Sequence, residues 1–271
     1  MSLSVEKTAS LRARFAALHE VGTLVMPNAW DVGSALVLQS LGFESVATTS
    51  SGFAASLGRH DQNITLAELA VHVADLCNVL DIPLSIDAEA GYSRDLDGLP
   101  RTVGQLAATG ASGISIEDYL PERGLLSIDE ATERVGLFAE TAHSEGLVVT
   151  ARAENHLYGV DDLDETISRL RAYERVGADV VYAPGLTSID DIGRVVAEVY
   201  APVNVLMLAG GPSTDELREV GVRRISAGGA LAFAAYGALA AGARELLEHG
   251  TWGFSARALT SAEREAAFGA H

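Results

Sequence analysis

Leu84-Ser85-Ile86-Asp87-Ala88-Glu89-Ala90-Gly91-Tyr92 joins a short apolar run to two carboxylates that are spaced two residues apart. The run is typical of a buried strand, and residues i and i+2 of a strand point to the same side. Asp87 and Glu89 are therefore expected to project together. Adjacent carboxylates repel each other unless a cation lies between them, and Mg²⁺ prefers such oxygen ligands. An ordinary solvated turn is the alternative for this segment taken alone.

Seven other segments share the short, apolar or β-branched character of Leu84–Ile86, and segments with helical periodicity lie between them. The predicted strands are Thr23–Met26, Ser45–Thr49, Leu84–Ile86, Gly113–Ile116, Leu147–Thr150, Asp179–Tyr182, Val203–Met207 and Arg224–Ser226. The predicted helices include Asp31–Leu41, Thr65–Leu80, Asp129–His143, Asp161–Val176 and Ile189–Tyr200. Eight strand-then-helix units predict an α/β fold of the (β/α)8 TIM-barrel class.

Residues that begin and end helices support this register. Glycines that suit a left-handed helix end precede five of the strands, at Gly42, Gly110, Gly146, Gly177 and Gly221. Suitable N-cap or first-turn residues are Asp31, Thr65, Ser127, Asp161, Ser188 and Ser213. A doubly wound sheet would usually carry a glycine-rich turn after its first strand, where this chain has Pro27-Asn28-Ala29-Trp30. We expect a single barrel domain over residues 1–271, with a helix at 1–20 and a C-terminal extension at 250–271.

Composition narrows the class of partner. The 271 residues include 19 basic and 37 acidic side chains, for a net charge of -18, which argues against nucleic-acid and anionic-membrane partners. The single cysteine, Cys77, excludes an internal disulfide. The first 20 residues lack the apolar core of a signal peptide, and no apolar run approaches the roughly 20 residues that span a bilayer. The sequence therefore predicts a cytoplasmic protein with small-molecule chemistry.

Polar residues follow four consecutive predicted strands, at the barrel end where such folds place their chemistry. They are Ser50-Ser51-Gly52, Asp87 with Glu89, Glu117-Asp118, and Arg152 with Glu154. The serine segment is either a simple turn or a site that grips a carboxylate with hydroxyl and backbone N–H groups.

Arg152 has two interpretations. It could form a buried ion pair with Glu117 or Glu154, but its planar fork also suits bidentate capture of a substrate carboxylate, which we favour. Glu117 is either a functional acid or a structural partner of Arg152. Asp61, on the loop after the second strand, is either a functional acid or an ordinary residue before a helix.

Taken together, these motifs resemble the isocitrate lyase and phosphoenolpyruvate mutase superfamily. The resemblance rests on Thr48-Thr49-Ser50-Ser51-Gly52, Ser56-Leu57-Gly58, Ser85–Tyr92, Ser115-Ile116-Glu117-Asp118 and Thr150-Ala151-Arg152, and it runs from about Pro27 to about Ala240. It implies a barrel that uses Mg²⁺, or alternatively Mn²⁺, to make or break carbon–carbon or carbon–phosphorus bonds beside a 2-oxo acid carboxylate. It also implies a homodimer or homotetramer, often with the eighth helix exchanged between subunits.

The resemblance also implies a role for each matching residue. Asp87 matches the main metal-contacting aspartate, and Glu89 and Glu117 match acids that hold the metal largely through its waters. Ser50, Ser51, Gly52, Asp87 and Arg152 match substrate-binding positions, while Glu117, Arg152 and Asp61 match catalytic ones. A cation that bridges the 2-oxo and carboxylate oxygens would stabilise the enolate on which these cleavages depend.

The acid/base loop departs from the superfamily pattern. Lyases of this group carry a Lys-Lys/Arg-Cys-Gly-His loop and phosphonopyruvate mutases a Lys-Thr-Asn-Ser loop, whereas this chain has Tyr119–Ser127, without cysteine, histidine or lysine. Only Glu122 or Arg123 could replace them. The sixth strand ends in Ala183-Pro184-Gly185 where lyases place a glutamate, and Asn204 lies two residues short of the usual asparagine.

The sequence thus predicts a magnesium-dependent lyase that cleaves a carbon–carbon bond in a small 2-oxo or 2-hydroxy dicarboxylate, in the manner of an oxaloacetate decarboxylase or a methylisocitrate lyase. Glu117, Tyr92 and Tyr182 are candidates for proton transfer. Two alternatives remain open. One is a carbon–phosphorus enzyme, either a phosphonomutase or a phosphonopyruvate hydrolase, and the other is a non-catalytic protein that binds 2-oxo acids.

Overall fold

The computed structural model describes residues 4–269. Its main strands are β1 (Leu24–Met26), β2 (Asn28–Ala29), β3 (Val46–Thr48), β4 (Leu84–Asp87), β5 (Gly113–Glu117), β8 (Val148–Arg152), β9 (Val180–Tyr182), β10 (Val203–Leu206) and β11 (Arg224–Ser226). A separate antiparallel pair is formed by β6 (Tyr119–Leu120) and β7 (Gly124–Leu125).

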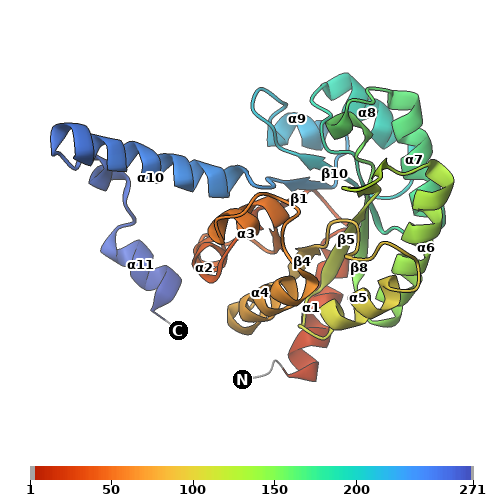
Figure 1. The fold of residues 1–271 in the computed structure, drawn as a ribbon, viewed down its shortest axis with the longest axis horizontal. Coiled ribbons are helices and arrows are strands. Elements are labelled where there is room, and N and C mark those ends of the chain that lie inside the picture. The colour runs from red at the N-terminus through yellow and green to blue at the C-terminus, as the bar shows by residue number, and fades with distance from the viewer. Residues whose placement is uncertain (1–3, 270–271) are drawn as a thin grey trace.

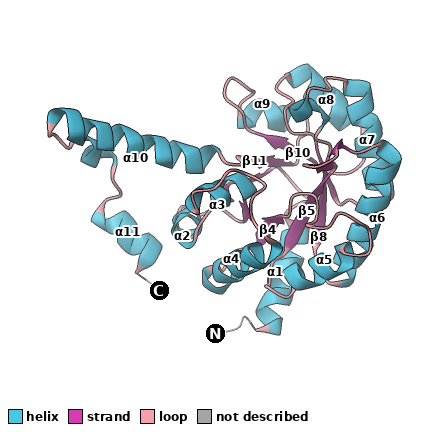
Figure 2. Cartoon of the chain, viewed as in Figure 1, coloured by secondary structure: helices cyan, strands magenta, loops and turns pink. Residues whose placement is uncertain are grey.

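The main strands close into a barrel. Their order is β1-β11-β10-β9-β8-β5-β4-β3-β2, and all neighbours are parallel. Only Pro27 separates β1 from β2, and proline has no N–H to donate to a sheet. These two segments are halves of one interrupted strand, which pairs with β11 through β1 and with β3 through β2. The ring therefore has eight strands (Figures 1 and 2), as the sequence predicted.

Helices surround the ring of strands. They are α1 (Val5–Ala17), α2 (Val32–Ser40), α3 (Ser50–Ser56), α4 (Leu66–Val79), α5 (Leu99–Ala107), α6 (Ile128–Ser144), α7 (Leu163–Arg175), α8 (Ile189–Glu198), α9 (Thr214–Glu219), α10 (Ala230–His249) and α11 (Ser261–Phe268). Two 3-10 turns, η1 (Asn155–Tyr158) and η2 (Gly253–Arg257), complete the order.

The predicted helix boundaries agree with the structure at most positions. Confirmed N-caps, each accepting a backbone N–H in the first turn, are Asp31, Thr65, Ser127, Ser188 and Ser213. For α7 the N-cap is Asp162, whereas Asp161 instead pairs with His156. All five predicted glycines, Gly42, Gly110, Gly146, Gly177 and Gly221, have φ between 75° and 110°. Side chains with a Cβ are strained in that region.

The barrel interior is apolar at its N-terminal end and polar further toward the C-terminal ends of the strands. Helix α1 closes the N-terminal end, where the fully buried Phe15 packs with Leu24, Val148 and Val180. A Cβ on Gly113 would lie 2.4 Å from the Phe15 ring, so glycine is needed there. Buried polar residues line the next levels, among them Ser85, Ser115, Thr150, Asn204, Arg224 and Ser226. Apolar layers are usual at this depth in such barrels, so the polar lining indicates a binding cavity.

Helix α10 projects away from the barrel (Figure 1), and only Ala232 and Gly242 along it are buried. The chain returns through η2 to α11, which packs against α2. By length and composition α10 is the one described helix that could cross a membrane, with a mean hydropathy of 1.2 over its most apolar window. A single helix of this kind is weak evidence for a span, because a helix that packs on another protein passes the same criteria.

Candidate active site

Asp87, the last residue of β4, is fixed from three directions. Its Oδ1 accepts a hydrogen bond from Arg152 Nη1 at 2.9 Å, and its Oδ2 accepts one from the Ser50 backbone N–H at 3.0 Å. Its own backbone N–H donates to Thr48 Oγ1 at 2.8 Å. The Ser50 N–H belongs to the first turn of α3, where unpaired N–H groups favour a negative charge. The structure therefore joins the carboxylate of β4 to the serine segment and to Arg152.

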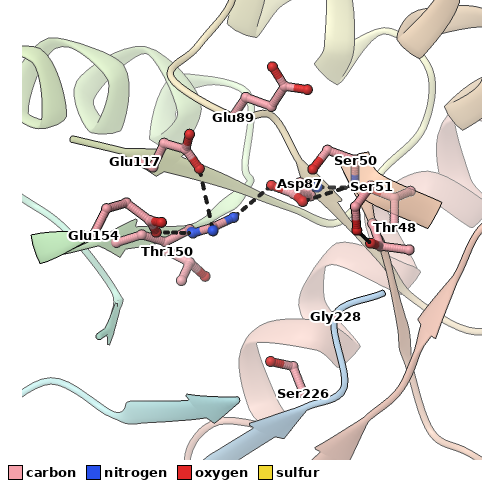
Figure 3. Close-up of polar contacts among 12 residues, drawn as sticks. Thr48, Ser50, Ser51, Asp87, Glu89, Glu117, Thr150, Glu154, Ser226 and Gly228 are labelled. Atoms are coloured by element: carbon pink, nitrogen blue, oxygen red, sulfur yellow. Dashed lines mark hydrogen bonds and ion pairs between the residues drawn. The ribbon is translucent and has the colours of Figure 1, made fainter. Parts of the chain in front are cut away.

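Arg152 connects the ends of three neighbouring strands. Besides Asp87 it contacts Glu154, with Nε to Oε1 at 2.8 Å, and Glu117, with Nη2 to Oε2 at 3.4 Å. Figure 3 shows these contacts as a continuous row across the barrel mouth. The guanidinium carbon also lies 5.4 Å from the centroid of the Tyr182 ring. The buried ion pairs that were one interpretation of Arg152 are thus present, and the guanidinium still borders the cavity.

Burial and charge oppose each other in this row. Burial raises the pKa of Glu117 well above its usual value; nearby Glu154 and Asp87 add to that rise, and Arg152 opposes it. Burial alone would lower the pKa of Arg152, but Glu154, Glu117 and Asp87 more than offset it, so its pKa lies well above the usual value. Arg152 is therefore permanently charged, whereas Glu117 is able to retain a proton.

Glu89 does not join this row, contrary to the expectation that it projects beside Asp87. Strand β4 ends at Asp87, and Glu89 lies in the following turn with φ of 47°, so the alternation of a strand no longer applies. Its carboxylate accepts a hydrogen bond from the Tyr92 hydroxyl at 3.1 Å. Figure 3 shows it apart from the contacts that join Asp87, Glu117 and Glu154. Burial, followed by the charge of Asp87, raises the pKa of Glu89 to about 8.

A cavity of about 170 Å³ opens at this end of the barrel and extends down into its interior. Ser50, Ser51, Asp61, Asp87 and Arg152 line its upper part. Partial burial raises the pKa of Asp61; Asp87 adds to the rise and a hydrogen bond with Ser50 opposes it. Gly52 is not a lining residue.

Gly52 instead lies behind the serines. Its N–H donates to Thr49 Oγ1, and a Cβ there would lie 2.6 Å from Thr49 Cγ2 and 3.0 Å from Trp30 Cβ. Gly52 thus allows the first turn of α3 to pack closely.

The segment that replaces the superfamily's acid/base loop is the β6–β7 hairpin. Arg123 forms an ion pair with Glu130, and Glu122 forms one with Arg94, all with largely solvated side chains. Neither candidate replacement lines the cavity. Tyr119 stacks on Tyr158 of η1, with ring centroids 3.4 Å apart, which attaches the hairpin to the chain after β8.

Several residues of the site were not singled out from the sequence. Gln62 donates from Nε2 to Glu117 Oε1 at 3.2 Å. Thr48, Thr150 and Arg224 line the cavity. So does Tyr182, which the sequence indicated as a candidate for proton transfer. The alternation of side chains along a strand could have identified Thr150, because it shares one face of β8 with Arg152.

The residues present fit a hard divalent cation by donor type and charge. Among residues 4–269 no three His, Cys, Asp or Glu side chains already converge as a metal site, and Arg152 lies between Asp87 and Glu117. Yet Asp61, Asp87, Glu89, Glu117 and Glu154 place five carboxylates around one guanidinium. Burial is the largest cause of the raised pKa values of Glu89 and Glu117, and the neighbouring carboxylates add to it. Carboxylate oxygens are the ligands that Mg²⁺ prefers.

Comparisons with known proteins identify the family. A family model described as phosphoenolpyruvate phosphomutase matches residues 15–247. A Burkholderia cenocepacia J2315 protein, assigned only provisionally as a lyase/mutase, has a crystal structure 41% identical in sequence, with a TM-score of 0.91 over 95% of both chains. An oxaloacetate decarboxylase of Bradyrhizobium sp. is 31% identical over 72% of this chain and 69% of its own length.

A further structure is oxaloacetate acetylhydrolase in complex with the product oxalate, with 26% identity and a TM-score of 0.85 over 95% of this chain and 94% of that one. The two solved structures share the barrel described above. The chain therefore belongs to the phosphoenolpyruvate phosphomutase family, an enzyme family of the isocitrate lyase and phosphoenolpyruvate mutase superfamily.

Proposed function

We propose that the protein is a cytoplasmic, magnesium-dependent lyase that cleaves a carbon–carbon bond in a small 2-oxo or 2-hydroxy dicarboxylate, by way of an enolate. The observation that carries this proposal is the junction of Asp87, Arg152 and the Ser50 backbone N–H beside one small cavity. It combines a carboxylate ligand for a metal with a guanidinium and N–H groups for a carboxylate. The oxaloacetate decarboxylase relative supports the choice of substrate class.

Each residue has a role in this proposal. Asp87, with Glu89 and Glu117, would hold the metal, which when bound withdraws electrons from the 2-oxo group. Arg152 and the Ser50–Gly52 segment orient the substrate carboxylate, and Asp61 borders the mouth. Glu117 is also a candidate for proton transfer to the enolate carbon, because its carboxylate lies beside Arg152 at the end of β5.

The short hairpin in place of the acid/base loop favours decarboxylation over aldol-type cleavage. Its charged residues Glu122 and Arg123 pair at the surface with Arg94 and Glu130 and do not line the cavity, so they supply no general base to it. Loss of CO₂ from oxaloacetate needs no base, because the bonding electrons pass directly into the enolate. A later proton on the enolate carbon completes the reaction, with pyruvate and CO₂ as products.

The test of this proposal is a proton NMR screen with added Mg²⁺. The substrates are oxaloacetate, methylisocitrate, isocitrate, citramalate and phosphonopyruvate. We expect oxaloacetate to be consumed faster than with Mg²⁺ alone, because the free ion also catalyses this reaction. Turnover of phosphonopyruvate alone would establish the carbon–phosphorus alternative, whereas saturable binding without any product would establish a non-catalytic binding protein.

Replacement of the metal ligand provides a second test. We expect Asp87→Ala to lose both Mg²⁺ binding by calorimetry and turnover of the consumed substrate. Asp215→Ala is the matched control, because this aspartate is 81% exposed on α9 and pairs only with Arg218. Unchanged Mg²⁺ affinity in Asp87→Ala would refute the assignment of Asp87.

A further inference from the structure

Arg224 is a buried cation at the base of the active-site cavity. It is the first residue of β11, it is 3% exposed, and it lines the same cavity as Ser50 and Arg152. Its Nε donates to Asn204 Oδ1 at 2.9 Å, and its Nη2 donates to Thr150 Oγ1 at 2.8 Å. Side chains of two other strands, β10 and β8, therefore hold this side chain in place.

Every hydrogen-bond partner of Arg224 is neutral. The third partner is His19, whose Nε2 lies 3.4 Å from Arg224 Nη1. His19 Nδ1 lies 2.8 Å from the Phe15 carbonyl oxygen, so Nδ1 carries the proton and Nε2 accepts. Within residues 4–269 no carboxylate lies within ion-pair distance of Arg224, and burial lowers its pKa to about 10.

Two of the other largely buried arginines are compensated by carboxylates. Arg152 contacts three carboxylates, and Arg169 pairs with Asp118 and Glu165. Arg134, like Arg224, has only neutral acceptors, the carbonyl oxygens of Ala90, Ser93 and Arg94, but it does not line the active-site cavity. A buried charge without a counter-charge costs several kcal/mol, so an uncompensated arginine in a cavity indicates a site for an anion.

The position of Arg224 relative to Arg152 indicates which anion it would bind. Thr150, which accepts from Arg224, and Arg152 lie two residues apart on one face of β8. Side chains two residues apart on a strand lie at successive levels, about 7 Å apart along the backbone, so the Arg224 contact with Thr150 lies one level below Arg152 in the same cavity. Two cations at different levels of one cavity suit a molecule with an anionic group at each end, and the cavity volume of about 170 Å³ admits only a small ligand.

We propose that Arg224 is the cation of a second anion subsite at the base of the cavity, and that this subsite binds the distal carboxylate of the substrate. The inference rests on the proposed function in that the substrate is a small dicarboxylate. Asn204 and Thr150 orient the guanidinium, while Arg152 and the start of α3 hold the other end of the molecule. A separate inorganic anion is the competing occupant of the subsite.

The test compares two ligands that differ only at the distal end. Malate carries a carboxylate where 2-hydroxybutyrate carries a methyl group. Affinities are measured by calorimetry with Mg²⁺ present, for the wild type and for Arg224→Met. We expect the wild type to bind malate at least about tenfold more tightly than 2-hydroxybutyrate, since a charge-assisted contact contributes that much. Arg224→Met should remove this preference and leave the affinity for 2-hydroxybutyrate within about twofold of the wild type.

Arg223→Met is the matched control. Arg223 precedes Arg224 but is exposed and contacts only the Gly22 carbonyl oxygen, so its replacement should leave both affinities unchanged. Equal binding of the two ligands by the wild type would overturn the proposal, even if Arg224→Met fails to fold. Phosphate or chloride that binds together with malate, in a manner that depends on Arg224, would also overturn it.

These results can be separated from those that test the reaction. A preference for malate that depends on Arg224, without turnover of any substrate, would contradict the proposed reaction and support the subsite. Turnover of a dicarboxylate with unchanged kcat and KM in Arg224→Met would contradict the subsite and leave the reaction intact.

Discussion

At the scale of single residues, Arg152 is the side chain that joins the ends of β4, β5 and β8. Glu117 and Arg152 are direct neighbours in the register of β5 and β8, and Asp87 lies one strand further along the ring. The sequence predicted which charged residues reach this end of the barrel, because each follows an apolar run. It did not predict that one guanidinium contacts all three carboxylates, since that depends on the register between strands.

Replacement of Arg152 by lysine tests whether this geometry matters beyond its charge. The ammonium of lysine is a point charge and does not reproduce the planar fork that contacts Glu154, Glu117 and Asp87 through three nitrogens. We expect Arg152→Lys to lower kcat/KM for the consumed substrate by roughly 100-fold, because at least one charge-assisted contact is lost. The melting temperature should fall by several degrees, because a carboxylate remains buried without its partner.

Arg123→Lys serves as the control for Arg152→Lys. Arg123 lies on the nearby hairpin, and its side chain is 53% exposed in its pair with Glu130. An exposed ion pair contributes little to stability, so both kcat/KM and the melting temperature should stay at the wild-type values. An Arg152→Lys variant with wild-type kcat/KM would show that only the charge of Arg152 is required.

At the scale of elements, local patterns predicted the strands, the glycines at helix ends and most of the N-caps. Such features depend on a few adjacent residues, as with Thr65 at the start of α4. The turn after β4 was not predicted, because glutamate does not indicate the positive φ that Glu89 adopts. The close packing of Gly91 against Leu99 likewise depends on residues that are distant from this turn. The position of Arg224 in the cavity was not predicted either, because it depends on how β11, β10 and β8 come together in the closed barrel.

The contact between α3 and α4 predicts how stability depends on pH. His72 of α4 stacks on Phe53 of α3, with centroids 3.8 Å apart, and burial lowers its pKa to about 4. The unfolded chain, with a histidine pKa near 6.5, binds more protons than the folded chain between these values. Stability should therefore fall as the pH drops from about 6.5 to 4, by about 3 kcal/mol from this group at about 1.4 kcal/mol per pKa unit.

Urea denaturation at a series of pH values measures this effect. His72→Gln should show a shallower loss of stability over that range, although His19, whose pKa burial also lowers to about 4, keeps part of the slope. His60→Gln is the control, because His60 is exposed on the loop after α3. A pH dependence that is identical in His72→Gln and the wild type would contradict the assignment of the slope to His72.

At the scale of the whole molecule, α10 projects away from its own barrel (Figure 1), and several of its apolar side chains are exposed. Four of these side chains are between 50% and 86% exposed, namely Phe233, Leu239, Leu246 and Leu247. An apolar surface of this extent favours a protein partner, and the superfamily resemblance implies a second copy of the chain. The start of α10 also borders the active site, because a Cβ on Gly229 would lie 2.6 Å from Ser51 Oγ.

We therefore expect the wild type to be a dimer or tetramer by size-exclusion chromatography with light scattering, and Leu239→Asp with Leu246→Asp to reduce the mass at least twofold. Tyr200→Asp is the control, because Tyr200 is 98% exposed after α8, away from α10, and its replacement should leave the mass unchanged. A monomeric wild type that instead co-sediments with lipid vesicles would identify α10 as a membrane-binding helix. If α10 is held by a second copy, the double variant should also lose activity, because the loop before α10 lies against Ser51 and its position depends on that contact.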